Sequence, residues 1–592
     1  MTETWDLSLI YPSDNQWEKD FNAYQTKLSE GKEKCLQLSV ETDLGKILEI
    51  FFELSRELEK LYTYVHLKFD EDLSNNFYKE MYGKVIFLST EFEKGFCFIE
   101  PKILELENEK FQALLNDPDL EKYKFYIERI YSLKNHTLSE DKEKLVALAG
   151  PSLDGSAKAF SAFNNADLKF EEVEDESKNK KPLTQALYLS YLRDKDRTLR
   201  KNAFEKIHEG YFNHENLLCE LLFANVNKHQ FSANARGYDS CLQAALFPNN
   251  IDLQVYHHLI KATKENGKAL HDYVSLRKEI MGLDKLFPYD LYVPLIEDCQ
   301  IEMSYEKACD TILESVAPLG KEYQEALTKG LKVRKWVDPY EKQGKRSGAY
   351  SSGCYDTEPY ILMNYHGNIN DIFTLAHEAG HSMHSYLSNH SQPYQYSRYP
   401  IFLAEIASTF NELLLLKQLK KEYADNEDVQ KYLLMHQIDS FRATFFRQTQ
   451  FAEFELLIHE KVENNEPLTP KFLNEEYQKL NQEYYGKDLE THILTASEWA
   501  RIPHFYYNFY VYQYATGISV AYYFLDQIEK DPSKVEDYLN FLQSGSKDYP
   551  QNILQKCGVD LVNGGVIESA LDRFQKLVID LKSKFEQKKQ LN

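Results

Sequence analysis

The segment 374–387, TLAHEAGHSMHSYL, gathers histidines around one acid in a chain with only 17 histidines in 592 residues. Within it, His377, Glu378 and His381 match the pattern H-E-x-x-H. On an α-helix, residues four apart lie on one face about one turn apart, so both imidazoles could bind one Zn²⁺. Glu378 would lie roughly 100° round the same helix, where it could act as general base toward a water that the metal activates. The pattern therefore predicts a hydrolytic metal site.

A chance match is the alternative interpretation of these histidines. Composition alone produces an H-E-x-x-H pattern in roughly a few per cent of chains of this length. The histidines would then lie on the polar face of an ordinary surface helix. A catalytic zinc site needs a third protein ligand, so the two interpretations differ in what they predict downstream.

The downstream segment 399–423 is predicted to form a second helix, and it carries a polar stripe. Glu405, Ser408, Thr409 and Glu412 fall at i, i+3, i+4 and i+7 among Leu, Ile, Phe and Ala. Polar groups on an apolar helix are costly to bury unless they are paired or coordinate a metal. We therefore expect Glu405 to be the third ligand and the other three to orient the imidazole N–H groups. A solvent-facing Glu405 is the alternative.

The residues around the motif favour a helix in close contact with another element. Asn370 or Asp371 could cap its start, and no proline interrupts it. Gly380 lowers helix propensity by about 1 kcal/mol relative to Ala. A glycine at this position suggests that another backbone packs close to the metal helix.

A glycine-bounded segment precedes the metal helix. Glycines at 344, 348, 353 and 367 bracket a β-like run, Pro359–Tyr365, which predicts a small sheet beside that helix. An exposed edge of this run could bind an extended peptide through backbone hydrogen bonds. A buried structural strand is the alternative.

The composition excludes some classes of partner. With 93 acidic and 69 basic residues, the net charge of −24 argues against binding to nucleic-acid phosphates. The first residues have no signal-peptide pattern, and no apolar run is long enough to span a membrane. The cysteines are scattered, which predicts free thiols and a cytoplasmic protein. They are Cys35, Cys97, Cys219, Cys241, Cys299, Cys309, Cys354 and Cys557.

The length and periodicity predict a large helical protein of several lobes. Apolar residues recur at spacings of three and four along most of the chain. The segment Lys169–Gln185 is acidic and then basic, as expected for a solvated loop or hairpin. We expect an N-terminal helical lobe at 1–115, a second lobe with this charged segment at 116–195, and a catalytic domain at 196–592.

Five segments closely resemble the oligoendopeptidase F family, a branch of the thimet-oligopeptidase-like M3 zinc metallopeptidases. They are TLAHEAGHSMHSYLSNHSQPYQYSRYPIFLAEIASTFNE, KRSGAYSSG, RQTQFAEFE, HFYYNFYVYQYATG and WDLSLIYP, so the resemblance runs from end to end. It implies a mostly α-helical, multi-lobed, neurolysin-like zincin fold with a deep central channel. One zinc ion per chain would be held by His377, His381 and Glu405, with Glu378 as catalytic base.

The tyrosine-rich segment 501–517 gains a role from this resemblance. In the wider superfamily, tyrosines of a comparable segment stabilise the oxyanion, and a tyrosine hydroxyl is a suitable neutral donor. We expect the segment to form one helix behind Pro503. Tyr512 is favoured as the donor, with Tyr510 and His504 contacting substrate, although most of these rings could be core.

The resemblance implies an endopeptidase that hydrolyses internal bonds of short, unfolded peptides. A zinc carboxypeptidase of similar helical fold is one alternative. A non-catalytic peptide-binding protein with a structural zinc is another, although an intact Glu378 and only three protein ligands favour catalysis. The sequence does not indicate an oligomeric state.

Overall fold

A computed structural model of the chain describes residues 4–296 and 301–591, so Cys299 lies outside the described residues. The chain divides into two compact units. Unit 1 comprises residues 1–135, 300–419 and 524–558, and unit 2 comprises residues 136–299, 420–523 and 559–592. This division differs from the three lobes predicted from the sequence, which stay a prediction. Each unit is described separately below.

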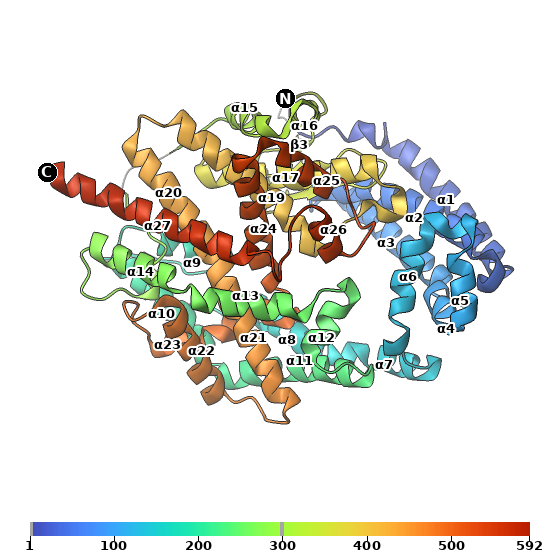
Figure 1. Cartoon of the computed structure of the whole chain (residues 1–592), viewed down its shortest axis with the longest axis horizontal. Coiled ribbons are helices and arrows are strands. Elements are labelled where there is room, and N and C mark those ends of the chain that lie inside the picture. Colours follow the sequence, from blue (N-terminus) through green and yellow to red (C-terminus); the bar gives the residue numbers. More distant parts are fainter. Residues whose placement is uncertain (1–3, 297–300, 592) are drawn as a thin grey trace. The chain divides into compact units, whose positions relative to one another are not determined.

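Unit 1 contains the N-terminal helices and the metal helix (Figure 1). Its helices are α1 Asp14–Leu36, α2 Val40–Glu71, α3 Asn76–Phe96, α4 Ile99–Glu105, α5 Asn108–Leu115, α6 Lys124–Ser132, α15 Tyr305–Ser315, α16 Lys321–Thr328, α17 Ile369–Ser391, α18 Tyr394–Ser397, α19 Ile401–Glu422, α25 Val535–Leu542 and α26 Pro550–Lys556. The N-caps of α1 to α3 are Ser13, Ser39 and Asn75, whose side chains accept hydrogen bonds from N–H groups of the first turn. Their apolar faces form one core with the two helices that follow.

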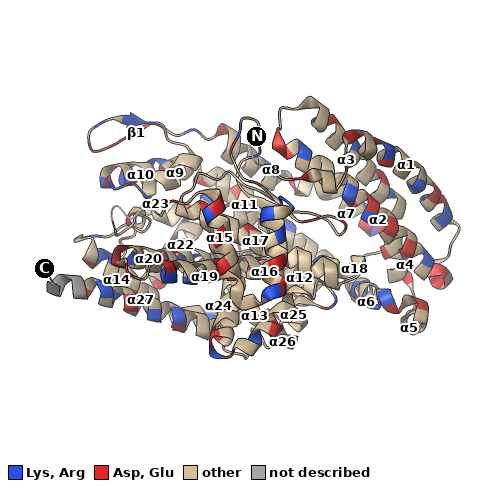
Figure 2. Cartoon of the chain, turned by 90° about the horizontal axis from the view of Figure 1, so that it is seen from above, with Lys and Arg blue, Asp and Glu red and all other residues tan. Residues whose placement is uncertain are grey.

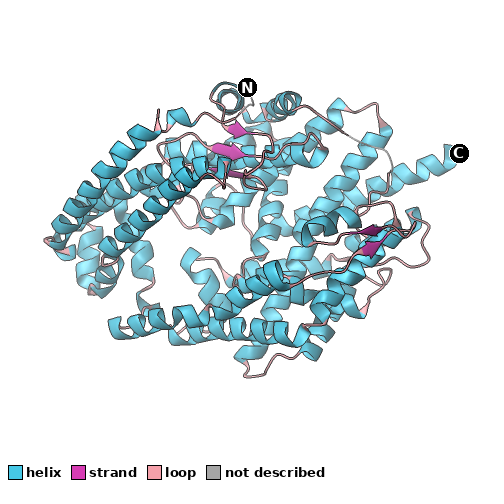
Figure 3. Ribbon diagram, turned by 180° about the vertical axis from the view of Figure 1, so that it is seen from behind, coloured by secondary structure: helices cyan, strands magenta, loops and turns pink. Residues whose placement is uncertain are grey.

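The strands of unit 1 form a three-stranded sheet in the order β3-β5-β4 (Figure 3). They are β3 Val337–Asp338, β4 Tyr350–Ser352 and β5 Tyr360–Leu362. Strand β5 pairs parallel with β3 and antiparallel with β4. The sheet beside the metal helix is confirmed. However, β5 is its fully buried centre, so the proposal of a free edge on Pro359–Tyr365 was wrong and the structural alternative was right. The edges are β3 and β4.

Unit 2 is built from helices and one short hairpin. Its helices are α7 Glu140–Leu153, α8 Gly155–Ala162, α9 Gln185–Leu192, α10 Arg197–Phe212, α11 Glu215–Ala235, α12 Cys241–Leu246, α13 Leu253–Glu265, α14 Lys268–Ile280, α20 Glu427–Phe441, α21 Arg447–Glu463, α22 Pro470–Tyr485, α23 Ile493–Ala496, α24 Tyr512–Lys530 and α27 Val566–Leu591. Strands β1 Val173–Glu174 and β2 Lys180–Lys181 pair antiparallel. The charged segment Lys169–Gln185 is therefore a hairpin, as predicted.

Acidic and basic side chains are interspersed along the helices, as Figure 2 shows for α1 and α2. Of the cysteines in the described residues, all are free thiols, and only Cys97 is exposed. Among the described helices, none combines the length and the apolar character needed to cross a membrane.

Candidate metal centre

The metal helix α17 begins two or three residues earlier than the sequence suggested. Asn368 is its N-cap, and its side chain accepts a hydrogen bond from the Asp371 N–H. The Asp371 carboxylate in turn accepts the backbone N–H of Asn368, which completes a capping box. Asp371 therefore caps the helix from its third position, and Asn370 is not the cap. This start places His377 and His381 in the middle of a continuous helix.

Gly380 allows the backbone of α19 to approach this helix. A Cβ at Gly380 would lie 2.6 Å from the carbonyl oxygen of Ala407 and 2.7 Å from the Cα of Ser408. Real Cβ atoms do not tolerate such distances from another backbone. The close backbone predicted from this glycine is confirmed, and it belongs to the helix that carries Glu405.

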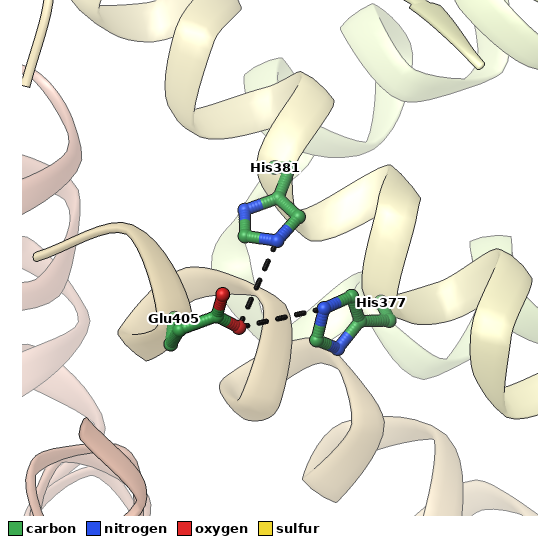
Figure 4. Close-up of side chains that lie close together, drawn as sticks. All are labelled: His377, His381 and Glu405. Atoms are coloured by element: carbon green, nitrogen blue, oxygen red, sulfur yellow. Dashed lines mark ion pairs between the residues drawn. The ribbon is translucent and has the colours of Figure 1, made fainter. Parts of the chain in front are cut away.

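The side chains of His377, His381 and Glu405 point toward one another (Figure 4). The Glu405 Oε2 lies 3.5 Å from the His377 Nε2 and 3.8 Å from the His381 Nε2. Three ligand atoms bound tetrahedrally at ~2.0–2.2 Å lie about 3.4 Å apart, so these separations fit one zinc ion. Among the described residues, this is the one cluster of three side chains able to hold a metal. The side chains are 19–28% exposed, which leaves them open to an ion.

Two polar residues of α19 orient this cluster. The Glu412 Oε1 lies 2.6 Å from the His377 Nδ1, which fixes the ring and directs its Nε2 toward Glu405. The Ser408 hydroxyl donates to the Glu405 backbone oxygen at 3.0 Å and to its Oε2 at 3.2 Å. Glu412 therefore contacts an imidazole as expected, whereas Ser408 orients the carboxylate instead.

The electrostatics of the cluster follow from burial and the nearby acids. Burial opposes protonation of His377, but the hydrogen bond that its ring donates to the Glu412 carboxylate, together with the charge of that carboxylate, outweighs it and raises the His377 pKa to about 9. Burial, with the nearby charge of His377, lowers the pKa of His381 to about 3. Burial also raises the pKa of Glu378 to about 7, and His377 opposes this rise. A carboxylate with a pKa near neutrality is suited to proton transfer.

Strand β4 contacts the carboxylate beside the metal cluster. The backbone N–H of Ser351 donates a hydrogen bond to the Glu378 side chain, which is only 7% exposed. The Ser351 hydroxyl lies 2.8 Å from that of Ser382, which ties the strand to α17. Ser351 was not predicted from the sequence. Its position between Gly348 and Gly353, ahead of the metal helix, was the available signal.

The other two histidines of α17 are His384 and His390. Among the described residues, neither forms a hydrogen bond with the side chains of His377, His381 or Glu405. His384 is fully buried, and its ring stacks on Tyr399 with centroids 3.5 Å apart. Tyr399 also packs near the metal helix, because its hydroxyl lies 2.9 Å from Ser385 and donates to the His381 carbonyl at 3.4 Å. His390 is exposed and bonds the carbonyl of Tyr386. His384 is therefore a core residue and His390 a surface residue.

The tyrosine-rich segment, residues 501–517, lies in unit 2. It was expected to form one helix, but it is broken into two elements. A 3₁₀-helix, Pro503–Tyr506, ends before Asn508 and Phe509, which have φ angles of 47° and 55°. Helix α24 begins only at Tyr512. Residues with positive φ cannot continue a right-handed helix, so the segment is broken.

The break separates buried rings from more accessible ones. Tyr512 is 4% exposed and packs on Tyr256 with centroids 5.2 Å apart. The rings of His504, Tyr510 and Tyr514 form a partly exposed cluster with centroids 5.4–6.4 Å apart. The structure thus brings Tyr510 together with His504 and buries Tyr512.

Comparison with known proteins assigns the chain to a family. Residues 190–572 match Peptidase family M3, and residues 102–170 match Oligopeptidase F. The chain is 42% identical over 577 residues to Oligopeptidase PepF of Bacillus subtilis, covering 97% of this chain and 86% of that protein. It is 40% identical over 587 residues to an Oligoendopeptidase F homolog of Borreliella burgdorferi, covering 99% of this chain and 98% of that protein.

Solved structures agree with this assignment. A crystal structure of a Chlamydophila abortus protein superposes with a TM-score of 0.92 at 38% identity, covering 98% of both chains. The crystal structure of oligoendopeptidase-F from Enterococcus faecium superposes with a TM-score of 0.73 at 32% identity, covering 97% and 99%. The mostly helical fold predicted from the resemblance is confirmed. The chain is a peptidase of family M3 and belongs to the oligoendopeptidase F group.

Proposed function

We propose that this peptidase is a zinc-dependent oligoendopeptidase that hydrolyses internal bonds of short, unfolded peptides. The observation that carries the proposal is the convergence of His377, His381 and Glu405 beside the buried carboxyl of Glu378. Cytoplasmic location and the exclusion of nucleic-acid and membrane partners stay predictions from the sequence. So does the deep channel implied by the resemblance.

The donor set supports zinc as the metal. Two imidazole nitrogens and one carboxylate oxygen are typical of catalytic zinc, and three protein ligands leave a position open. When bound, the ion would supply a Lewis acid that polarises the substrate carbonyl and lowers the pKa of water. Glu412 would hold His377 in the tautomer whose Nε2 is free to bind, and Ser408 would orient Glu405.

Glu378 is the proposed general base. It takes a proton from the attacking water, whose oxygen bonds to the peptide carbonyl carbon. It then gives that proton to the leaving amine as the C–N bond breaks. The Ser351 N–H holds the Glu378 carboxylate in place during both transfers. Burial, which raises the Glu378 pKa, favours return of the proton to the leaving amine.

Strand β4 is the proposed contact for the peptide backbone. It is an edge strand of its sheet and lies against α17 through Ser351 and Ser382. An extended peptide could add to this edge through main-chain hydrogen bonds, which recognise a peptide without reading its side chains. This assigns to β4 the role that the sequence analysis gave to Pro359–Tyr365.

A tyrosine of segment 501–517 is the proposed donor to the oxyanion. Tyr512 was the first choice from the sequence, but the burial of Tyr512 against Tyr256 favours Tyr510 as the donor, with His504 beside it contacting substrate. Replacing each tyrosine by phenylalanine removes only the hydroxyl. We expect Tyr510→Phe to lower kcat on the order of 100-fold and Tyr512→Phe to change it little.

The test of the function is hydrolysis of a quenched fluorogenic peptide with and without a chelator. We expect activity to disappear on chelation and to return with added zinc. Unchanged activity in the metal-free protein would contradict the proposal. Amidation of the substrate's C-terminus separates the alternatives, because an endopeptidase cleaves the blocked peptide and a carboxypeptidase does not.

A further inference from the structure

Helix α21 carries the motif RQTQFAEFE at residues 447–455, which the proposed function does not use. Arg447, Phe451, Phe454 and Glu455 fall at i, i+4, i+7 and i+8, so they share one face of the helix. All four contact residues 498–509, the segment that contains His504 and ends directly before Tyr510. One face of α21 therefore holds this segment, which belongs to the same unit.

The first contact of this surface is ionic and the next are aromatic. The Arg447 Nη2 lies 2.7 Å from the Glu498 Oε1, in the 3₁₀-helix Ser497–Arg501. Phe451 and Phe454 pack on the fully buried ring of Phe505, with centroids 5.6 and 5.2 Å away. These contacts anchor the chain just before and just after His504.

The last contact lies at the strained turn. The backbone N–H of Phe509 donates to the Glu455 Oε1 at 2.6 Å. The Phe509 ring, which is 2% exposed, packs between His459 and Tyr256, with centroids 4.4 and 5.6 Å away. Glu455 itself is fully buried. The carboxyl therefore fixes the backbone at the residue that precedes Tyr510.

The turn at Asn508 and Phe509 and its contact with Glu455 include features that lower the stability of the fold. Asn508 and Phe509 both adopt the left-handed conformation, which is unfavourable for residues other than glycine. The Glu455 Oε2 has no hydrogen-bond partner among the described residues, and a buried polar atom without a partner costs further free energy. Glycines at positions 508 and 509 and an apolar side chain at position 455 would remove these costs. Strain maintained in this way is typical of segments that position functional groups.

We propose that Glu455 is a positioning residue that holds the Asn508–Phe509 turn and thereby sets the orientation of the Tyr510 and His504 side chains for catalysis. The proposal deepens the proposed function and rests on it, because Tyr510 and His504 are there the groups that contact substrate. The interaction needs a hydrogen-bond acceptor at position 455. It does not need a charge.

Three substitutions at one position separate these requirements. Glu455→Gln keeps an acceptor oxygen, Glu455→Leu removes it, and Glu455→Asp withdraws it by about 1.5 Å, beyond hydrogen-bond distance of the Phe509 N–H. We expect Leu and Asp to lower kcat on the order of 100-fold with KM nearly unchanged, since misplaced catalytic groups act on the transition state. Gln should stay close to wild type. Metal content should be equal in all variants.

The matched control is Glu460→Leu, the same change at an exposed position of the same helix. Amide hydrogen exchange of residues 503–512 gives a readout that does not depend on activity. Exchange should speed up in Leu and Asp and stay slow in Gln and in the control. Glu455→Asp keeps the test available if the Leu variant does not fold.

The proposal is overturned if Leu and Asp keep kcat within twofold of wild type, or if Gln loses as much as Leu. Unchanged exchange in Leu and Asp also overturns it. Failure of the proposed function looks different. Wild-type hydrolysis would then survive chelation, while the exchange data would still report whether Glu455 holds the turn.

Discussion

Two pairs of closely spaced histidines occur among the described residues, one in each unit, and only one has the geometry of a metal site. The rings of His377 and His381 are 4.8 Å apart and nearly perpendicular, at 84°. Their Nε2 atoms face the carboxylate of Glu405. The rings of His229 and His459 are 5.3 Å apart and nearly parallel, at 7°.

The difference lies in how the ring nitrogens are used. His229 Nδ1 lies 3.0 Å from His459 Nε2, and His459 Nδ1 bonds the backbone carbonyl of Glu455 at 2.7 Å. Burial lowers the pKa of His229 to about 3 and that of His459 to about 4. This pair is a neutral element of the core. The carboxylate that faces both rings therefore distinguishes the candidate metal site from the second pair.

The largest expected effect comes from removing one ring of each pair. His381→Gln should lower zinc affinity well beyond the 10–100-fold typical of an outer partner and abolish hydrolysis. His459→Gln should leave zinc bound at wild-type stoichiometry, because its pair has no carboxylate. Metal content after dialysis against zinc checks both. Zinc lost in His459→Gln alone would reverse the comparison.

Next in size is the effect of Glu378, the proposed base beside the first pair. Glu378→Gln should lower kcat on the order of 100- to 10,000-fold, since general acid–base catalysis contributes that much. Zinc content should not change, because Glu378 is not one of the three converging ligands. Steady-state kinetics with metal analysis tests this. Full activity in a zinc-loaded variant would remove Glu378 from the mechanism.

A third comparison concerns the acid that contacts an imidazole. Glu412 contacts the Nδ1 of His377, whereas the Nδ1 of His459 bonds a backbone carbonyl. Glu412→Gln weakens the 2.6 Å contact with His377, and we expect zinc affinity to fall about 10–100-fold. Glu422→Gln, an exposed position on the same helix, is the control. Competition with a chromogenic chelator measures both. Equal affinity in the two variants would show that Glu412 does not support the ligand.

A substitution at Gly380 tests why Glu405 reaches the first pair. Gly380→Ala should destabilise unit 1 by about 1–3 kcal/mol and weaken zinc binding, because two backbones must separate. Gly83→Ala is the matched control, since a Cβ there has nothing within 4 Å. That change should stabilise helix α3 by about 0.5–1 kcal/mol. Thermal unfolding of both variants measures these changes. An unchanged stability of Gly380→Ala would contradict the packing argument.

A further expected effect concerns acid stability. His229 and His459 have folded pKa values below the ordinary value of 6.5, so protons favour the unfolded state. Their contribution is complete above pH 6.5 and declines as the pH falls toward 4, by at most about 1.4 kcal/mol per pH unit for each ring. Unfolding midpoints at pH 7 and pH 5 should differ less in a His229→Phe, His459→Phe double variant. An unchanged pH dependence would contradict the neutral-core assignment.

Much of the candidate site could be predicted because helical spacing carries it. His377, His381, Glu405 and Glu412 lie on two regular helices, where periodicity alone decides which residues share a face. The contact at Gly380 was also predictable, since glycine inside a helix has few other reasons to be there.

The errors arose where backbone conformation is set by tertiary contacts. Nothing in the local pattern distinguishes β5 as the central strand, because pairing order depends on distant strands. The break at Asn508 and Phe509 was missed, since neither is a glycine and the hydrogen bond that stabilises it comes from Glu455 on another helix. Ser351 was missed for the same reason, as it acts through its backbone.

The most direct test of the metal site is anomalous diffraction at the zinc edge from crystals of the zinc-loaded protein. The account predicts one peak, about 2.0–2.2 Å from the His377 Nε2, the His381 Nε2 and a Glu405 carboxylate oxygen. A peak at His229 and His459, or full zinc occupancy with no density at the first pair, would contradict it.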